Sequence, residues 1–328
     1  MFASKPLRVR VATLALAMLA PAGSLAQHAW PVKPVRVAIG NSAGSTPDVV
    51  ARVFAEGMTA SLGQPMLVEN RPGADGVIAA NTVARATPDG YTLLIGTQQT
   101  FAVAPHTRKA LPFDPLRDFI PISMVIDTTQ GNALAVHQSY PVRTIGELIA
   151  YAREHPNKLT YSTTVATASL FMEWFKRRAG VQMREVRYKD APLAVQDALG
   201  GRVSVAVNSP FALQHGIKAG TLRLLVTATS ERIEGWGDVP TVQEVFPDYG
   251  FVSFVALFGP AGLPKAIVER LNRDTEAALK SPAFAKMTHQ VMWYNREGAR
   301  TPEALAKLVR GQFEYYAQLT RDLGIKPQ

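Results

Sequence analysis

Residues 40–52 read Gly-Asn-Ser-Ala-Gly-Ser-Thr-Pro-Asp-Val-Val-Ala-Arg, and they directly follow the apolar run Val35–Ile39. The apolar run is typical of a buried strand, and the stretch after it is typical of a loop that opens a helix. Thr46 is a suitable N-cap, and Pro47 suits the first helical position because its missing N–H is no loss there. Free N–H groups and the positive dipole end of such a helix attract anions. The stretch therefore predicts an anion-binding loop between a strand and a helix.

The same loop matches a second pattern, because Gly40 to Gly44 spell the G-x-S-x-G nucleophile elbow. In that interpretation Ser42 is a nucleophile that a histidine activates and a carboxylate orients. Six histidines are candidates for the base: His28, His106, His137, His155, His215 and His289. However, hydrolases of this class place several strands before the elbow, whereas here it follows the first strand of the mature chain. We therefore predict a binding loop with no catalytic residue and keep a serine hydrolase as the less favoured alternative.

The N-terminus has the pattern of an export signal. Lys5, Arg8 and Arg10 precede the apolar stretch Val11–Ala20, and Ser24-Leu25-Ala26 supplies small residues for a cleavage site. We expect residues 1–26 to be a signal peptide that is cleaved near Ala26, which places the mature protein in the periplasm. An uncleaved N-terminal anchor is the alternative. The apolar stretch is short for a membrane span.

Composition narrows the remaining classes. The formal charge of the 328-residue chain is +9, and it falls to about +6 without the signal peptide, which holds three basic and no acidic residues. The positive charges are scattered rather than clustered, so we predict no nucleic-acid partner. The chain has no cysteine, so an apolar core without disulfides must hold the fold. We predict no metal site and no cofactor, because the chain has neither the H-E-x-x-H motif nor two histidines four residues apart on one helix.

Short β-branched runs alternate with amphipathic segments along the chain, which predicts an α/β architecture. The expected strands are Val35–Ile39, Met66–Glu69, Tyr91–Ile95, Ile120–Ile126, Ala133–His137, Leu159–Ser162, Glu185–Tyr188, Val203–Val207, Leu222–Ala228 and Ser253–Phe258. The expected helices are Pro47–Leu62, Ala74–Ala86, Ile145–Glu154, Ala168–Ala179, Leu193–Leu199, Phe211–Ala219, Lys265–Leu279 and Pro302–Leu323. No linker separates two halves, so we expect strands to cross between two lobes and a ligand to lie in the cleft.

Two motifs carry a family resemblance: Val68-Glu69-Asn70-Arg71-Pro72-Gly73-Ala74 and Pro88-Asp89-Gly90-Tyr91-Thr92-Leu93-Leu94. They resemble the substrate-binding receptors of tripartite tricarboxylate transporters, the Bug receptors. Further matches in the order of the family are Leu111–Pro115, Tyr188-Lys189, Ile217–Gly220, Asp238–Thr241 and Pro260–Pro264. The resemblance implies a type II-like periplasmic-binding-protein fold, in which crossing strands join two α/β domains around a central ligand cleft. It places residues 27–126 plus 251–328 in domain 1 and residues 127–250 in domain 2.

The resemblance also implies a function without catalysis. Receptors of this family bind small carboxylates and hand them to membrane permease subunits, and some instead report to the ectodomain of a sensor. We therefore expect a monomeric carboxylate receptor that works with either partner. Family receptors hold the carboxylate through main-chain N–H groups, hydroxyls and water. Hydrogen bonds to a charged carboxylate are stronger than neutral ones, and this arrangement avoids burying a cation in the empty site.

The expected ligand-binding residues lie in four loops. They are Asn41, Ser42, Gly44, Ser45, Thr46 and Asp48 in the first loop, Gln98 and Gln99 in the second, Thr163, Thr164 and Thr167 in the third, and Asn208 in the fourth. Asp48 has the alternative role of stabilising its helix, and Thr167 that of capping one. The family usually has Pro-Phe at the positions of Gly40-Asn41, glycines in the loop at 162–167 and acidic residues at the positions of Ser204 and Asn208. We expect these departures, above all Gly40-Asn41, to alter the ligand preference.

Overall fold

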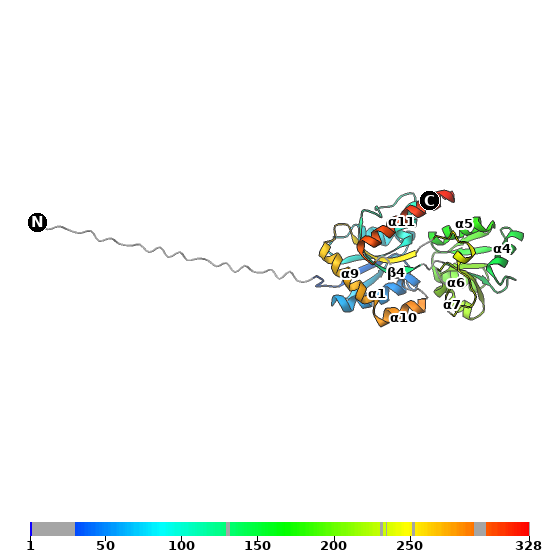
Figure 1. The fold of residues 1–328 in the computed structure, drawn as a ribbon, viewed down its shortest axis with the longest axis horizontal. Coiled ribbons are helices and arrows are strands. Elements are labelled where there is room, and N and C mark those ends of the chain that lie inside the picture. The colour runs from blue at the N-terminus through cyan, green and yellow to red at the C-terminus, as the bar shows by residue number, and fades with distance from the viewer. Residues whose placement is uncertain are drawn as a thin grey trace.

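The computed structural model describes residues 1, 30–128, 132–229, 232–233, 235–250, 253–291 and 300–327. It has two five-stranded sheets, which lie in the two lobes of Figure 1. The first sheet has the order β2-β1-β3-β10-β4, with bounds β1 Val35–Ile39, β2 Met66–Asn70, β3 Thr92–Thr97, β4 Phe119–Thr128 and β10 Ser253–Pro260. The second has the order β7-β6-β8-β5-β9, with bounds β5 Ala133–His137, β6 Thr160–Thr163, β7 Arg184–Arg187, β8 Val205–Asn208 and β9 Leu222–Thr227. The predicted signal peptide lies outside the described residues, apart from Met1.

Both sheets are mixed. In the first sheet β1 runs parallel to β2 and β3, whereas β10 runs antiparallel to β3 and β4. In the second sheet β6 runs parallel to β7 and β8, whereas β5 runs antiparallel to β8 and β9. The chain passes from one sheet to the other after β4 and returns before β10, and these two strands pair with each other from Ser253↔Thr128 to Pro260↔Phe119. Crossing strands therefore connect the lobes, as expected.

Helices cover both sheets (Figure 1). The first lobe holds α1 Thr46–Leu62, α2 Val77–Ala84, α3 Ala104–Thr107, α9 Lys265–Leu279, α10 Pro282–Val291 and the start of α11 Pro302–Asp322. It also holds the 3-10 turn η1 Ala74–Gly76 and the π-helical turn η2 Gln99–Val103. The second lobe holds α4 Ile145–Glu154, α5 Ala166–Ala179, α6 Ala191–Leu199, α7 Pro210–Lys218 and α8 Val242–Val245. Among the described residues, no helix combines the length and the apolar character needed to cross a membrane.

The C-terminal helix α11 belongs to both lobes. Leu305 and Val309 near its start are buried in the first lobe with Phe101 and Phe258. Tyr316, two turns further on, is buried in the main core of the second lobe. Figure 1 shows α11 running from the first lobe toward α5. The helix is thus a further connection between the lobes, beside the two strand crossings.

The structure places a strand at each of the ten predicted positions, but parts of the helix prediction are wrong. The predicted helix Ala74–Ala86 begins only at Val77, because Ala74 and Asp75 have φ of 49° and 59° and cannot continue a right-handed helix. Helix α1 begins at Thr46 with Ser45 as its N-cap, so Thr46 is not the cap. Helices α5, α6 and α7 begin one or two residues before their predicted starts. The sequence analysis also missed η2, α3, α8 and α10, of which three are single turns too short to carry a periodic pattern.

Candidate ligand-binding site

A cavity of about 610 Å³ lies between the two lobes and is lined by residues of both. Four loops from the first lobe contribute: Gly40–Pro47, Pro72–Gly76, Thr97–Thr100 and the segment at Arg108. The second lobe contributes Asn132, residues 164–167, residues 188–195 and residues 208–212. Ten of the twelve predicted ligand-binding residues line it: Asn41, Ser42, Gly44, Ser45, Thr46, Gln98, Gln99, Thr164, Thr167 and Asn208. Asp48 and Thr163 do not.

The loop before α1 is held in shape by its own hydrogen bonds. The Gly44 N–H donates to Asp48 Oδ2 at 2.9 Å, and the Ser45 N–H donates to the Ser42 carbonyl at 3.2 Å. The Ser45 hydroxyl donates to the same carbonyl at 2.7 Å. Gly44 and Ser45 therefore line the cavity with N–H groups that already have partners. The N–H groups of Thr46 and Asp48 lie in the first turn of α1, where a helix offers no carbonyl partner.

The carboxylate of Asp48 accepts hydrogen bonds that hold this loop in shape. Its side chain is buried, and besides the Gly44 N–H it accepts hydrogen bonds from Asn70 Nδ2 at 2.7 Å and Arg52 Nε at 3.1 Å. Asn70 Nδ2 also donates to the Asn41 carbonyl at 3.1 Å. Burial by itself raises the pKa of Asp48, but the hydrogen bonds from Asn70, Arg52 and Gly44 outweigh it and hold the pKa below its ordinary value. These contacts agree with the alternative role of Asp48, which is to stabilise the start of its helix.

The second loop of the first lobe is tied to its surroundings by its side chains. The Gln98 side chain is buried, and its amide donates to the hydroxyl of Tyr316 on α11. Burial raises the pKa of that hydroxyl well above its ordinary value, so Tyr316 is neutral at physiological pH. Gln99 Nε2 donates to Asp75 Oδ1 at 2.7 Å. Both glutamines therefore line the cavity, and each amide donates a hydrogen bond within the protein.

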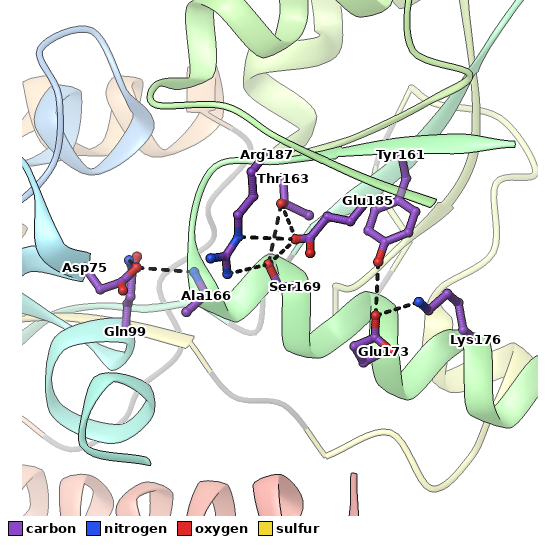
Figure 2. Close-up of polar contacts among 10 residues, drawn as sticks. All are labelled: Asp75, Gln99, Tyr161, Thr163, Ala166, Ser169, Glu173, Lys176, Glu185 and Arg187. Carbon is purple, nitrogen blue, oxygen red and sulfur yellow. Dashed lines mark hydrogen bonds and ion pairs between the residues drawn. The ribbon is translucent and has the colours of Figure 1, made fainter. Parts of the chain in front are cut away.

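The loop before α5 is held by a polar cluster around Glu185 (Figure 2). Thr163 is fully buried, and its hydroxyl donates to Glu185 Oε1 at 2.5 Å. The Ser169 hydroxyl donates to the same oxygen, and Arg187 contacts both Ser169 and Glu185. Thr163 thus supports the loop, and it is not among the residues that line the cavity. Helix α5 begins at Ala166 with Val165 as its N-cap, so Thr167 lies inside the first turn, and the capping role considered for it is wrong.

Asn208 lines the cavity, and its side chain has a donor without a partner among the described residues. Its Oδ1 accepts a hydrogen bond from the Ser209 N–H at 2.8 Å, which fixes the orientation of the amide and leaves Nδ2 on the other side. Nδ2 is buried and has no hydrogen-bond partner among the described residues. A buried donor without a partner is costly, and a ligand acceptor would relieve that cost. The next residue, Ser209, has its hydroxyl 2.9 Å from the Thr46 hydroxyl, and this contact joins α7 to α1 across the cavity.

Among the described residues, four that carry a charge line the cavity: Asp75, Arg108, Lys189 and Asp190. Arg108 Nη1 lies 3.1 Å from Asp75 Oδ2, and these two residues form an ion pair. Asp190 caps α6 by accepting a hydrogen bond from the Leu193 N–H at 3.0 Å. Lys189 is exposed at the cavity and makes no hydrogen bond or ion pair with another described residue. The lining therefore offers a single unpaired cation among the residues that the structure describes.

Sequence reasoning missed several lining residues. Asp75 directly follows the resemblance motif Val68–Ala74 and lies in the predicted helix Ala74–Ala86, and Arg108 lies in a segment for which no element was predicted. Ser209 directly follows the predicted site residue Asn208 but was not itself predicted. No pattern signals that these residues meet, because their contacts join segments far apart in the chain.

The hydrolase alternative gains no support from this geometry. Ser42 lines the cavity, but none of the described lining residues is a histidine that can act as its base. In the described part of the chain, no three histidine or acidic residues are grouped so that they could hold a metal ion. Besides the Asp75–Arg108 ion pair and Asp190, the described lining offers hydrogen-bond donors and one unpaired cation, and these suit the binding of a small anion.

Comparison with known proteins identifies relatives over nearly the whole chain. A family model described as "Tripartite tricarboxylate transporter family receptor" matches residues 50–322. A UPF0065 protein of Bordetella bronchiseptica is 32% identical over 97% of this chain and 93% of its own length. Among solved structures, Rhodopseudomonas palustris Rpa4515 with adipate has a TM-score of 0.84 at 29% identity, covering 91% of this chain and 100% of that chain.

Two further solved structures are similar to this chain in fold. The periplasmic binding protein BugD has a TM-score of 0.82 at 28% identity, covering 91% of this chain and 100% of that chain. Rhodopseudomonas palustris MatC with bound malate has a TM-score of 0.80 at 27% identity, covering 88% of this chain and 99% of that chain. These likenesses confirm the fold class predicted from the sequence, an α/β periplasmic-binding-protein fold. The family model begins at Val50, so the loop that precedes α1 lies outside the matched residues.

Proposed function

The chain belongs to the tripartite tricarboxylate transporter receptor family, and we propose that it is an extracytoplasmic receptor that captures a small carboxylate for a transporter of this type. The observation that carries the proposal is a cavity between the lobes that meets the N-terminus of α1 and is lined by Asn208, whose buried Nδ2 has no hydrogen-bond partner among the described residues. Helix N-termini and amide donors stabilise a carboxylate through charge-assisted hydrogen bonds. Relatives solved with adipate and malate support a carboxylate as the ligand.

The same proposal includes the export of the protein, its oligomeric state, its partner and its domains. Residues 1–26 act as the export signal, the mature protein is a periplasmic monomer, and a membrane permease receives its ligand. Residues 27–126 plus 251–328 form one domain and residues 127–250 the other. The Thr46–Ser209 contact supports closure of the domains over the ligand, because it bridges the cavity at its two helix ends. Closure excludes water and strengthens the polar contacts inside.

A ligand screen tests the function directly. Protein freed of bound ligand by unfolding and refolding is melted with monocarboxylates, dicarboxylates, tricarboxylates and aromatic acids, each beside its uncharged amide. We expect at least one acid to raise the melting temperature by several degrees, because a ligand at 100 times its Kd stabilises the fold by about 2.7 kcal/mol. We expect the matching amide to have no effect. If no acid acts at millimolar concentration, or if amides act equally, a carboxylate is not the ligand.

The exchange Asn208→Asp tests the proposed contact. It keeps the acceptor for the Ser209 N–H and replaces the unpartnered donor by a carboxylate oxygen. We expect the affinity for the best acid of the screen to fall at least about tenfold, because a charge-assisted hydrogen bond becomes a repulsion. Isothermal titration calorimetry measures the change. The control is Asn157→Asp, an exposed position outside the cavity lining, which should bind like the wild type. An unchanged affinity in the Asn208 variant would refute the contact.

A further inference from the structure

We propose that Asp75 is a specificity-determining residue that disfavours a second carboxylate on the ligand. The receptor then prefers monocarboxylates with a neutral or cationic far end over dicarboxylates. The inference rests on the proposed function only in that the ligand carries a carboxylate. The protein itself places a carboxylate, that of Asp75, in the lining of the cavity.

Asp75 is held firmly at the cavity wall. It lies in η1 with φ of 59° and ψ of 33°, and its carbonyl accepts a hydrogen bond from the Thr100 hydroxyl at 3.2 Å. Its Oδ1 accepts from Gln99 Nε2 at 2.7 Å, and its Oδ2 pairs with Arg108 Nη1 at 3.1 Å. A carboxylate with these partners on both oxygens keeps one orientation. Asp75 is therefore a fixed negative group in the lining.

The same carboxylate reaches the opposite lobe. Asp75 Oδ1 also accepts a hydrogen bond from the Ala166 N–H at 3.3 Å, the first residue of α5 (Figure 2). The N-cap residue of α5, Val165, has no side-chain acceptor. A helix N-terminus without a cap attracts an anion, and here the anion is the protein's own. A ligand carboxylate that approached this end of α5 would compete with Asp75 for the same N–H group.

The charges of the lining also disfavour a second carboxylate on the ligand. Arg108 is paired with Asp75, and Asp190 is engaged at the start of α6, which leaves Lys189 as the unpaired cation among the described lining residues. One ligand carboxylate is compensated by Lys189 and by the donors around Asn208. A second carboxylate finds no unpaired cation and meets the negative charge of Asp75. An ammonium group at the far end of the ligand is instead attracted to Asp75. A neutral hydroxyl or amide group there is not repelled by it.

The variant Asp75→Asn removes the negative charge of Asp75 but keeps its hydrogen-bond acceptor. Its amide oxygen still accepts from Ala166 and Gln99, but the negative charge is lost and Arg108 becomes an unpaired cation. Asp75→Gly removes the side chain altogether, and glycine adopts a φ of 59° without strain, so this variant guards against misfolding. The control Asp114→Asn removes an equal charge from an aspartate that pairs with Arg117 at 3.0 Å outside the cavity lining.

The probes are butyrate, succinate and 4-aminobutyrate, and the hexanoate, adipate and 6-aminohexanoate series, titrated by calorimetry. The wild type should prefer the monocarboxylate or the amino acid to the dicarboxylate of the same length. In Asp75→Asn the affinity ratio of dicarboxylate to monocarboxylate should rise at least about tenfold, which corresponds to about 1.4 kcal/mol. The amino acids should lose affinity relative to the monocarboxylates. Asp114→Asn should leave every ratio at its wild-type value.

The exchange Arg108→Gln gives the reciprocal result, because Asp75 loses its partner while its charge remains. The dicarboxylate-to-monocarboxylate ratio should then fall below that of the wild type. The proposal is overturned if ligands bind but these ratios do not change in the Asp75 variants. It is also overturned if the Asp75 variants weaken all three ligand types equally, because Asp75 then serves only to join the lobes. If no acid of any length binds the wild type or the variants, the proposed function itself has failed.

Discussion

The exchange Gly40→Ala is expected to destabilise the protein by about 3 kcal/mol and to abolish ligand binding. A Cβ atom at position 40 would lie 2.4 Å from the Cα atom of Gly76. Gly76 is itself closely packed, because a Cβ added there would lie 2.3 Å from the Thr100 hydroxyl oxygen. Overpacking against backbone commonly costs about 1–3 kcal/mol, occasionally more, since the chain must shift. The segment that shifts includes Asp75 and the loop before α1, which both line the cavity.

Urea unfolding and calorimetric titration with the acid found in the screen measure these two effects. The matched control is Gly311→Ala in α11, where a Cβ meets no atom within 4 Å. That exchange should leave binding unchanged and stabilise the protein by about 0.5–1 kcal/mol, because alanine favours helix. If Gly40→Ala unfolds at the urea concentration of the wild type and binds equally well, the close approach of the two loops does not matter for the site.

The exchange Asp48→Ala is expected to have the second largest effect, a loss of about 2–3 kcal/mol of stability with weaker ligand binding. It removes the acceptor of the Gly44 N–H, of Asn70 and of Arg52 in a buried position. Buried donors left without a partner cost about 1–3 kcal/mol. Asp48→Asn should cost less, because its oxygen keeps part of these bonds. The control Asp89→Ala removes an acceptor of the Tyr91 N–H outside the cavity lining and should leave binding unchanged.

The stability that Asp48 contributes depends on pH in a definite direction. Its pKa in the folded protein is lower than its ordinary value, so the unfolded chain takes up the proton first as the pH falls. The contribution is therefore complete above the ordinary value of about 3.9 and decreases as the pH falls from there toward the folded pKa. Unfolding free energies of wild type and Asp48→Asn should differ at pH 7 and converge in acid. A difference that stays constant down to acid pH would contradict the lowered pKa.

Much of the fold was readable from the sequence because its elements are local. All ten strands lie where short apolar runs predicted them, and α4 and α9 have the predicted bounds. The strand Val35–Ile39 and the helix after it are identifiable because burial on a sheet and on one helix face leaves a regular pattern of apolar residues. The family resemblance, which rests on turn motifs such as Val68–Ala74, correctly predicted the periplasmic-binding-protein fold.

The local prediction failed where backbone conformation depends on distant contacts. Nothing in the pattern of 74–86 indicated that Ala74 and Asp75 have positive φ, which non-glycine residues rarely adopt. The turn η2 is packed between Asp75 and Tyr316, two residues from distant parts of the chain. Thr46 was expected to cap its own helix, and instead its hydroxyl contacts Ser209 in the other lobe. In each case a tertiary contact outweighed the local preference.

The loop at 40–52 shows most clearly which features the sequence determines and which the tertiary structure determines. The sequence by itself determined that a strand, a glycine-rich turn and a helix with a free N-terminus follow one another there, because these preferences involve only neighbouring residues. Only the tertiary structure decided what each residue does: Gly40 allows Gly76 to approach, Asp48 accepts the hydrogen bond of the Gly44 N–H, and the Thr46 hydroxyl contacts Ser209 in the other lobe. The physical reason is that a hydrogen-bond donor is available to a ligand only if no distant part of the chain has already bound it.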